Sequence, residues 1–148
     1  MLLVMATLTL SASNASATVK IPNACALLKE SLAQNSIGKL YHVARFLYSP
    51  SAFTGGVACF AHYGGFGVTL ELENVNEPYF EGFAITTSSN QSGLGSGALL
   101  VKGTTPEQGM PFRGVTFNRG GIYAALIEEV VVAPSEVVVM ARTILPHL

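Results

Sequence analysis

The sequence predicts an α+β domain, in which N-terminal, central and C-terminal helices pack on an antiparallel sheet and one disulfide links helix to sheet. Three observations lead to this prediction. Apolar residues recur at helical spacing near both ends of the chain, glycine pairs separate strand-like runs between them, and the chain has two cysteines. Hairpins imply antiparallel pairing, and helices at three points can cover a sheet.

The first 17 residues are predicted to be a signal peptide. Residues 2–10 form an apolar run that suits a leader and is shorter than the roughly 20 residues that a bilayer span needs. Ala15-Ser16-Ala17 has the small-residue pattern that signal peptidase accepts, so we expect cleavage after Ala17. No basic residue precedes the apolar run, and a buried N-terminal strand is the alternative interpretation. Residues 18–148 are then expected to form a single domain.

The N-terminal helix is predicted to begin after Asn23 and to end near Asn35. Asn23 suits the N-cap position, and Leu27, Leu28 and Leu32 form an apolar stripe. Cys25 would lie in the first turn of this helix. In an oxidising compartment two cysteines most often pair, so we expect a disulfide between Cys25 and Cys59.

A hairpin is predicted over residues 57–73, because Gly64-Gly65 separates two strand-like runs. In the second run apolar residues alternate with polar ones, which predicts one buried face and one solvated face. The buried set is Val68, Leu70 and Leu72, and the solvated set is Thr69, Glu71 and Glu73. Residues 39–48 fit either a strand or a helix.

The central helix is predicted after the hairpin, with Asn76 as its cap, Pro78 in its first turn and its end near Thr87. A polar, glycine-rich loop is expected over residues 86–97. Strands are expected over residues 98–102, 112–117 and 122–132, the last two joined by a tight turn at residues 118–121. Pro134-Ser135-Glu136 begins the closing helix, whose buried side would hold Val137, Val138, Met140, Ala141, Ile144 and Leu145.

The composition excludes several functions. With eight basic and nine acidic residues, the chain has no excess of positive charge for binding nucleic acid. It contains no aspartate, which removes Ser-His-Asp triads, EF-hand loops and aspartate nucleophiles. No later apolar run is long enough to cross a membrane. Any acid–base chemistry would therefore depend on glutamate or histidine.

The candidate binding residues are His42, His62, Arg113 and Arg119. His42 and His62 would meet if residues 39–48 pair beside the first hairpin strand, but no third zinc ligand can be assigned, so we expect no metal and no cofactor. Arg113 and Arg119 flank one strand and could bind an anionic group or keep a sheet edge soluble. Asn90-Gln91-Ser92 is an N-glycosylation sequon, which has meaning only in a eukaryotic source.

Several short motifs resemble the "CxLL…C" domains of bacterial exported proteins and lipoproteins of unknown function. They are the segment from Asn23 to Lys29, a second cysteine at the opening of a strand, Gly93-Leu94-Gly95 and a terminal helix. The chain departs from that pattern in lacking a lipobox, in the neighbours of Cys59 and in having no acidic residue after Gly95. The resemblance implies a disulfide-pinned α+β sandwich in the cell envelope and carries no activity with it.

These observations favour an exported, non-catalytic binding or interaction domain in the periplasm or outside the cell. Its partner would be an unidentified protein or small molecule, and a polar loop at residues 86–97 or 103–111 would form the contact surface. A small secreted hydrolase that uses His42 or His62 with a glutamate is the second hypothesis, and a structural subunit of the envelope is the third. No nucleophile–base pair is evident, so the sequence favours binding over catalysis.

Overall fold

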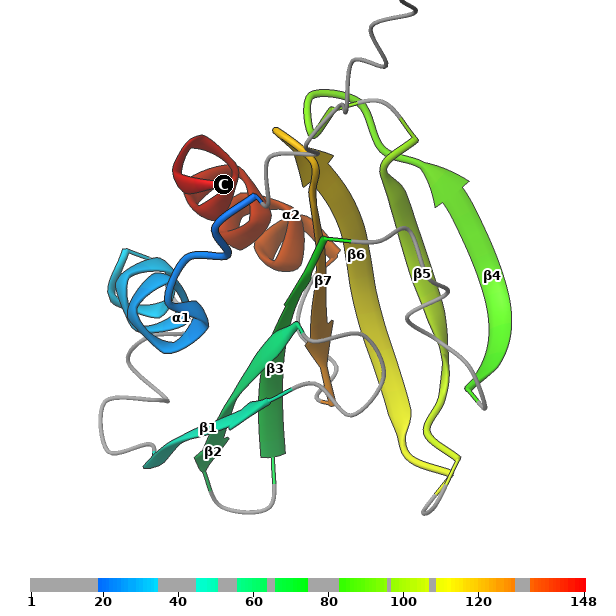
Figure 1. The fold of residues 1–148 in the computed structure, drawn as a ribbon. Helices are drawn as coiled ribbons and strands as arrows, with labels where there is room; N and C mark the ends of the chain where they lie inside the picture. The colour runs from blue at the N-terminus through cyan, green and yellow to red at the C-terminus, as the bar shows by residue number, and fades with distance from the viewer. Residues whose placement is uncertain are drawn as a thin grey trace, which may run out of the picture.

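A computed structural model describes residues 19–34, 45–50, 56–63, 66–74, 83–95, 97–106, 109–129 and 134–148. Within these ranges seven strands form one antiparallel sheet, and two α-helices lie side by side on one of its faces (Figure 1). The elements are α1 (Ala24–Ala33), β1 (Arg45–Pro50), β2 (Val57–Tyr63), β3 (Phe66–Glu73), β4 (Ala84–Asn90), β5 (Leu99–Thr104), β6 (Pro111–Arg119), β7 (Ile122–Glu128), α2 (Pro134–Ile144) and the short 3-10 helix η2 (Leu145–His147).

The strand order is β1-β2-β3-β7-β6-β5-β4, so the sheet consists of two meanders. The strands β1 to β3 form one and the strands β4 to β7 form the other. They join where β3 pairs with β7, for example at Leu70 opposite Leu126. The chain therefore passes from the middle of the sheet to its far edge between β3 and β4, and β1 and β4 are the two edge strands.

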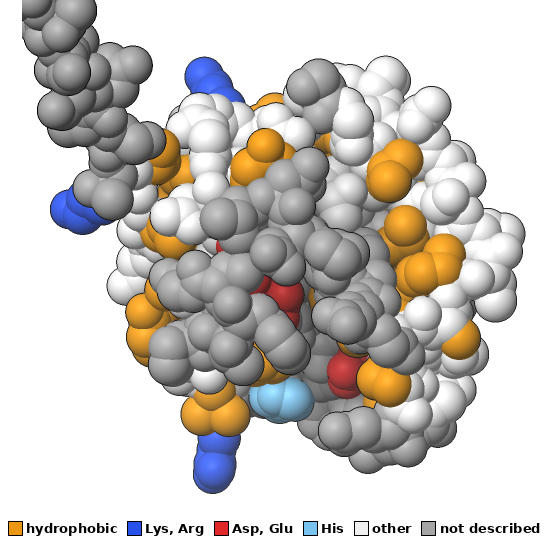
Figure 2. Space-filling model, turned by 45° about the vertical axis from the view of Figure 1, so that its right-hand side comes forward, with side chains coloured by type: hydrophobic (Ala, Val, Ile, Leu, Met, Phe, Trp, Pro, Cys, Tyr) orange, Lys and Arg blue, Asp and Glu red, His pale blue; other side chains and the backbone are white. Residues whose placement is uncertain are grey.

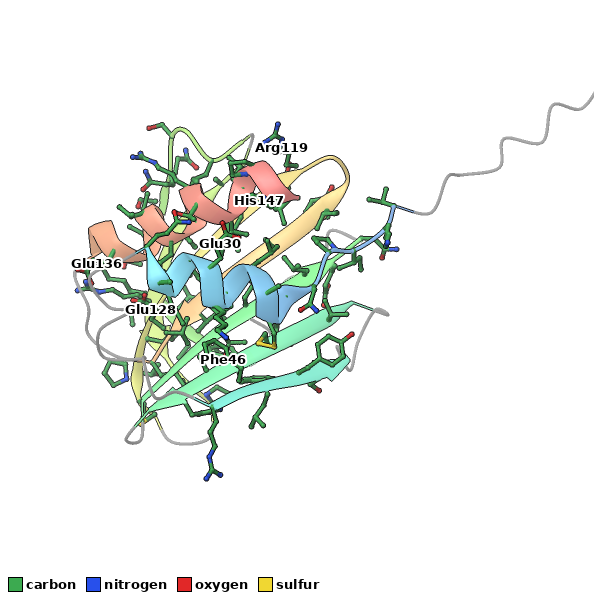
Figure 3. The ribbon with its side chains drawn as sticks, turned by 90° about the vertical axis from the view of Figure 1, so that its left-hand side faces the viewer. Glu30, Phe46, Arg119, Glu128, Glu136 and His147 are labelled. Atoms are coloured by element: carbon green, nitrogen blue, oxygen red, sulfur yellow. A yellow bond between two sulfur atoms is a disulfide. The ribbon has the colours of Figure 1, made fainter. Side chains whose placement is uncertain are left out.

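The predicted N-terminal helix and the disulfide are confirmed. The Ala26 backbone N–H donates to Asn23 Oδ1 over 3.0 Å, which caps the first turn of α1. The leucine stripe of α1 is buried against the sheet. Cys25 is bonded to Cys59 in the middle of β2, with the two Cα atoms 5.0 Å apart. The bond is visible between α1 and the sheet in Figure 3.

The β2–β3 hairpin has the predicted bounds, but the prediction of a solvated second face is wrong. Val68, Leu70 and Leu72 are buried against the helices, as expected. On the opposite face Glu73 is only 4 % exposed, and Glu71 is half-buried. Alternation along one strand identifies the two faces but does not show what packs on each of them.

The predicted α+β fold with a central helix is also wrong. The antiparallel sheet dominates the described residues, which contain two short helices, and residues 84–90 form strand β4 where a helix end and a loop were expected. Residues 75–82, where that helix would begin, lie outside the described ranges. Ile85, Thr86 and Thr87 are β-branched, and the backbone of β5 offers them a partner that local spacing does not reveal.

The C-terminal half follows the sequence more closely. The strands β6 and β7 pair through a turn at Gly120-Gly121, where both glycines have positive φ angles of 61° and 82°. The closing helix α2 buries its predicted apolar side against β6, β7 and α1, except that Leu145 lies in η2 and is only partly buried. Ser31 on α1 donates its buried hydroxyl to the Met140 carbonyl on α2, over 3.3 Å. The main core therefore lies between the helix pair and the sheet.

A smaller apolar cluster lies on the face of the sheet that the two helices do not cover. It is centred on Val101, Phe112 and Ile127, and the Phe83 ring meets the Phe112 ring edge-to-face with 4.9 Å between centroids. No helix in the described part of the chain is long and apolar enough to span a membrane.

Candidate functional site

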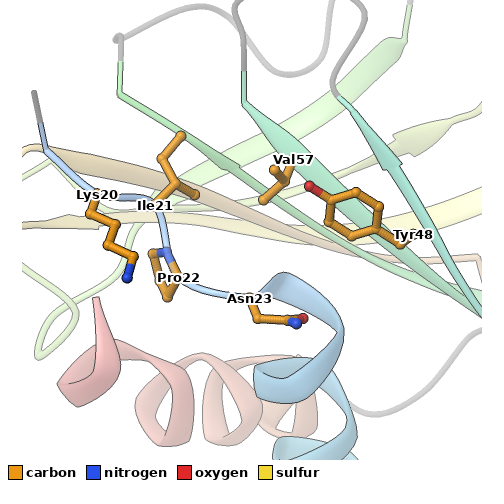
Figure 4. Close-up of a pocket in the computed structure, with 6 residues that line it drawn as sticks. All are labelled: Lys20, Ile21, Pro22, Asn23, Tyr48 and Val57. Atoms are coloured by element: carbon orange, nitrogen blue, oxygen red, sulfur yellow. The ribbon is translucent and has the colours of Figure 1, made fainter.

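A pocket of about 730 Å³ opens between the N-terminal end of α1 and the sheet edge formed by β1 and β2 (Figure 4). This volume falls within the range of small-molecule pockets. The segment before α1 forms one wall, and Tyr48 of β1 and Val57 of β2 form the other. The lining residues are Lys20, Ile21, Pro22, Asn23, Tyr48 and Val57.

The pocket combines apolar walls with a positive potential. Ile21, Pro22, Val57 and the Tyr48 ring supply apolar surface, and Lys20 is the one charged residue among the described residues that line it. The axis of α1 begins at this wall, so the partial positive charge of the helix N-terminus adds to that of Lys20. This arrangement suits an apolar molecule that carries an anionic group.

The disulfide fixes the two walls of this pocket relative to each other. Cys25 follows the lining residue Asn23 by two positions, and Cys59 lies directly opposite the lining residue Tyr48 in the β1–β2 register. The Asn23 side chain is held by the hydrogen bond that caps α1. Tyr48 is 59 % exposed, so its ring is available to a ligand. The pocket is therefore largely formed before a ligand binds.

A buried carboxyl lies at the other end of the helix-covered face. Glu128 on β7 is 0 % exposed, and within the described part of the chain neither of its carboxylate oxygens has a hydrogen-bond partner. The pKa of Glu128 is raised to about 7, mainly by burial and also by repulsion from Glu136, against the opposing effect of Arg113. Figure 3 shows Glu128 and Glu136 together where α2 begins.

The opposite face of the sheet carries further acidic groups and His62. Burial, together with repulsion from Glu73, raises the pKa of Glu71 to about 7. Glu129 and His62 approach each other across Gly67: a Cβ at Gly67 would lie 3.0 Å from Glu129 Oε2 and 3.6 Å from His62 Nδ1. Figure 2 shows acidic side chains and a histidine on this side of the molecule.

The candidate residues from the sequence do not form one site. His62 is exposed and stacks on Phe60, with 6.2 Å between ring centroids. Its proposed partner His42 lies outside the described residues. Arg113 lies opposite Glu128 in the β6–β7 register. Arg119 donates to the carbonyl of Leu145, the first residue of η2, over 3.4 Å.

Sequence reasoning missed the pocket, because its walls come from segments far apart in the chain and carry no motif. Lys20, the first charged residue after the predicted leader, was the only available signal. It also missed the Glu128 environment, since the sequence does not show that Glu128 is buried or that the fold brings it near Glu136. Among the described residues no group of three or more histidine, cysteine or acidic side chains could hold a metal ion.

The disulfide indicates an oxidising compartment outside the cytoplasm. No family model matches the chain, and no curated protein or solved structure is significantly similar to it.

Proposed function

We propose that the protein is an exported, non-catalytic binding domain whose pocket beside α1 takes a small apolar molecule with an anionic group. Export to the periplasm or the extracellular space is part of this proposal and is supported by the leader-like N-terminus and the disulfide. The observation that carries the proposal is a pocket of about 730 Å³ with apolar walls and a lysine as its one charged described residue.

The chemistry of the lining residues determines the expected ligand class. The Tyr48 ring and Val57 can cover a flat or branched hydrocarbon body, with the Tyr48 hydroxyl available for a hydrogen bond. Lys20 and the N-terminus of α1 favour a carboxylate, sulfonate or phosphate at the rim. A cationic ligand would meet positive potential without a compensating carboxylate among the described lining residues.

The test compares two fluorescent probes, 1-anilinonaphthalene-8-sulfonate and the uncharged N-phenyl-1-naphthylamine, in titrations of the oxidised protein. Both should bind at one site. Lys20→Gln should weaken binding of the sulfonate by about two- to fivefold, the range of an exposed ion pair, and leave the uncharged probe unaffected. Tyr48→Ala should weaken both probes, because both use the aromatic wall.

Lys29→Gln is the matched control, because Lys29 is an exposed lysine on α1 that does not line the pocket. It should leave both affinities at the wild-type values. The proposal fails if Lys20→Gln and Lys29→Gln behave alike, or if Tyr48→Ala changes neither probe. Circular dichroism of each variant excludes unfolding as the cause of a change.

A second candidate function, a small hydrolase, is favoured by the approach of His62 to Glu129 across Gly67. A carboxylate beside an imidazole can orient it as a general base. The test is turnover of p-nitrophenyl acetate by the double variant His42→Gln/His62→Gln, with exposed His147→Gln as the control. A hydrolase would lose turnover only in the double variant, whereas equal background rates in all three proteins would exclude this function.

A further inference from the structure

The edge strand β4 has no charged residue and no proline to oppose pairing with another chain. It closes the sheet on one side, and all seven of its residues, Ala84–Asn90, are exposed. They include no charged residue and no proline. The other edge strand, β1, begins with Arg45 and ends with Pro50. Charges and prolines on an edge oppose the addition of a further strand, so β4 is the vulnerable edge.

On the face of the sheet away from the helices, the surface around β4 is also without charge, whereas on the helix-covered face Lys102 of β5 lies opposite Thr87. In Figure 1 the two helices cover the middle of the sheet, and β4 lies beyond them. In Figure 2 the side of the molecule that carries β4 shows white and orange side chains with no blue or red ones among them. A register shift at Ile85/Thr87 disturbs the start of β4, but its pairing with β5 is regular from Thr87 to Asn90.

A glycosylation sequon lies at the end of this strand. Asn90-Gln91-Ser92 has the required hydroxyl residue at the third position and no proline at the second. It is the one Asn-x-Ser/Thr sequence within residues 18–148. Asn90 and Ser92 are both exposed, at the point where the chain leaves β4 and turns.

The backbone holds this turn firmly in place. The Gln91 N–H donates to the Ala98 carbonyl over 2.8 Å, and Gly93 and Gly95 have positive φ angles. Leu94, between these glycines, is 0 % exposed and belongs to the main core. Leu94 therefore anchors the loop in the core, while the Asn90 side chain at the start of the loop is exposed to solvent.

We propose that Asn90 is the acceptor of an N-linked oligosaccharide, which covers the uncharged β4 edge and keeps the protein monomeric. The donor is a lipid-diphosphate-linked oligosaccharide. A bond forms between Asn90 Nδ2 and C1 of the first sugar, the bond from C1 to the diphosphate oxygen breaks, and the lipid diphosphate leaves with the proton that the amide loses. This inference depends on export in a eukaryotic source and not on the identity of the pocket ligand.

The first test is the mass of the protein purified from its native source, before and after treatment with peptide-N-glycosidase F. The untreated chain should be heavier than its sequence, and the enzyme should remove the excess and convert Asn90 to aspartate in the peptide map. Unmodified Asn90 in native material would overturn the proposal. The fluorescence titrations of the pocket would be unaffected by that result, so the two proposals fail separately.

The second test uses a matched pair of variants expressed in the native host. Ser92→Ala removes the sequon and keeps Asn90, whereas Ser92→Thr keeps the sequon. In analytical ultracentrifugation Ser92→Ala should self-associate at micromolar concentration, and Ser92→Thr should stay monomeric. Adding Thr87→Lys to Ser92→Ala should restore the monomer, because a lysine then protects the edge. If Ser92→Ala stays monomeric, the glycan does not protect this edge.

Discussion

Cys25, in the first turn of α1, is bonded to Cys59 directly opposite Tyr48 of β1. One covalent bond therefore connects the N-terminal helix to the sheet close to the pocket, whose lining includes Asn23 and Tyr48. Stability and ligand affinity should consequently depend on the same bond.

Removing this bond should destabilise the protein. The double variant Cys25→Ala/Cys59→Ala is expected to lose about 2–5 kcal/mol of unfolding free energy, as small secreted domains do when a native disulfide is removed. Urea denaturation with and without dithiothreitol measures the effect. The reductant should lower the urea midpoint of the wild type and leave that of the double variant unchanged. Equal midpoints for oxidised and reduced wild type would contradict this prediction.

Leu94 should contribute to stability as a core residue although it lies in a glycine-rich loop. Its side chain is 0 % exposed and packs in the main core, so Leu94→Ala should cost about 2–5 kcal/mol through lost burial and an unfilled cavity. Leu47→Ala is the matched control, because Leu47 is 55 % exposed on β1 and should change stability by about 0.5 kcal/mol or less. Similar thermal midpoints for the two variants would show that Leu94 does not anchor the loop.

Glu128 should make the protein less stable as pH rises through neutrality. Its pKa is about 7 in the folded state against a reference of 4.5, so between these values the folded state binds more protons than the unfolded state. Unfolding free energy therefore falls with increasing pH across this window, by at most about 3 kcal/mol for this group. Glu71, whose pKa is also raised to about 7, acts in the same direction.

Glu128→Gln tests this pH dependence, because the amide keeps the size of the side chain and cannot ionise. Thermal midpoints measured from about pH 5 to about pH 8 should fall less in this variant than in the wild type, and the variant should be the more stable protein at the upper end. Glu30→Gln, a substitution at an exposed position on α1, should retain the wild-type slope. A wild-type slope in Glu128→Gln would contradict the assignment.

Gly103 should be intolerant of any side chain. A Cβ there would collide with the Ala84 carbonyl oxygen and would lie 2.8 Å from Phe112 Cε1. Gly103→Ala should therefore separate β4 from β5, at a cost of about 1–3 kcal/mol. Hydrogen exchange at the β4 and β5 amides measures the effect.

Gly97→Ala is the control that distinguishes the effect of a steric clash, expected at Gly103, from the effect of backbone strain. No atom lies within 4 Å of a Cβ at Gly97, but its φ is +73°. It should cost about 1 kcal/mol of strain and leave exchange in β4 unchanged. Faster β4 exchange in Gly97→Ala than in Gly103→Ala would reverse this interpretation.

Elements whose signals are local can be predicted from the order of residues alone. Asn23 identifies the start of α1, the alternation of Val68, Leu70 and Leu72 identifies β3, and Gly120-Gly121 identifies the turn between β6 and β7. The disulfide could be predicted because the chain has two cysteines, so each has one possible partner within the chain. In each case the decisive physical property belongs to a residue and its near neighbours.

Features that depend on contacts between distant segments follow from the folded structure and not from local patterns. The residues of β4 form a strand because β5 supplies backbone partners. The helix-start signal at Asn76 is local and gives no information about that pairing. Glu71 and Glu128 have raised pKa values because other parts of the chain bury them. The pocket lies between the segment before α1 and Tyr48, which are distant in the sequence and are brought together near the Cys25–Cys59 bond. Burial and charge proximity depend on which segments the fold brings together, and neither can be read from one stretch of sequence.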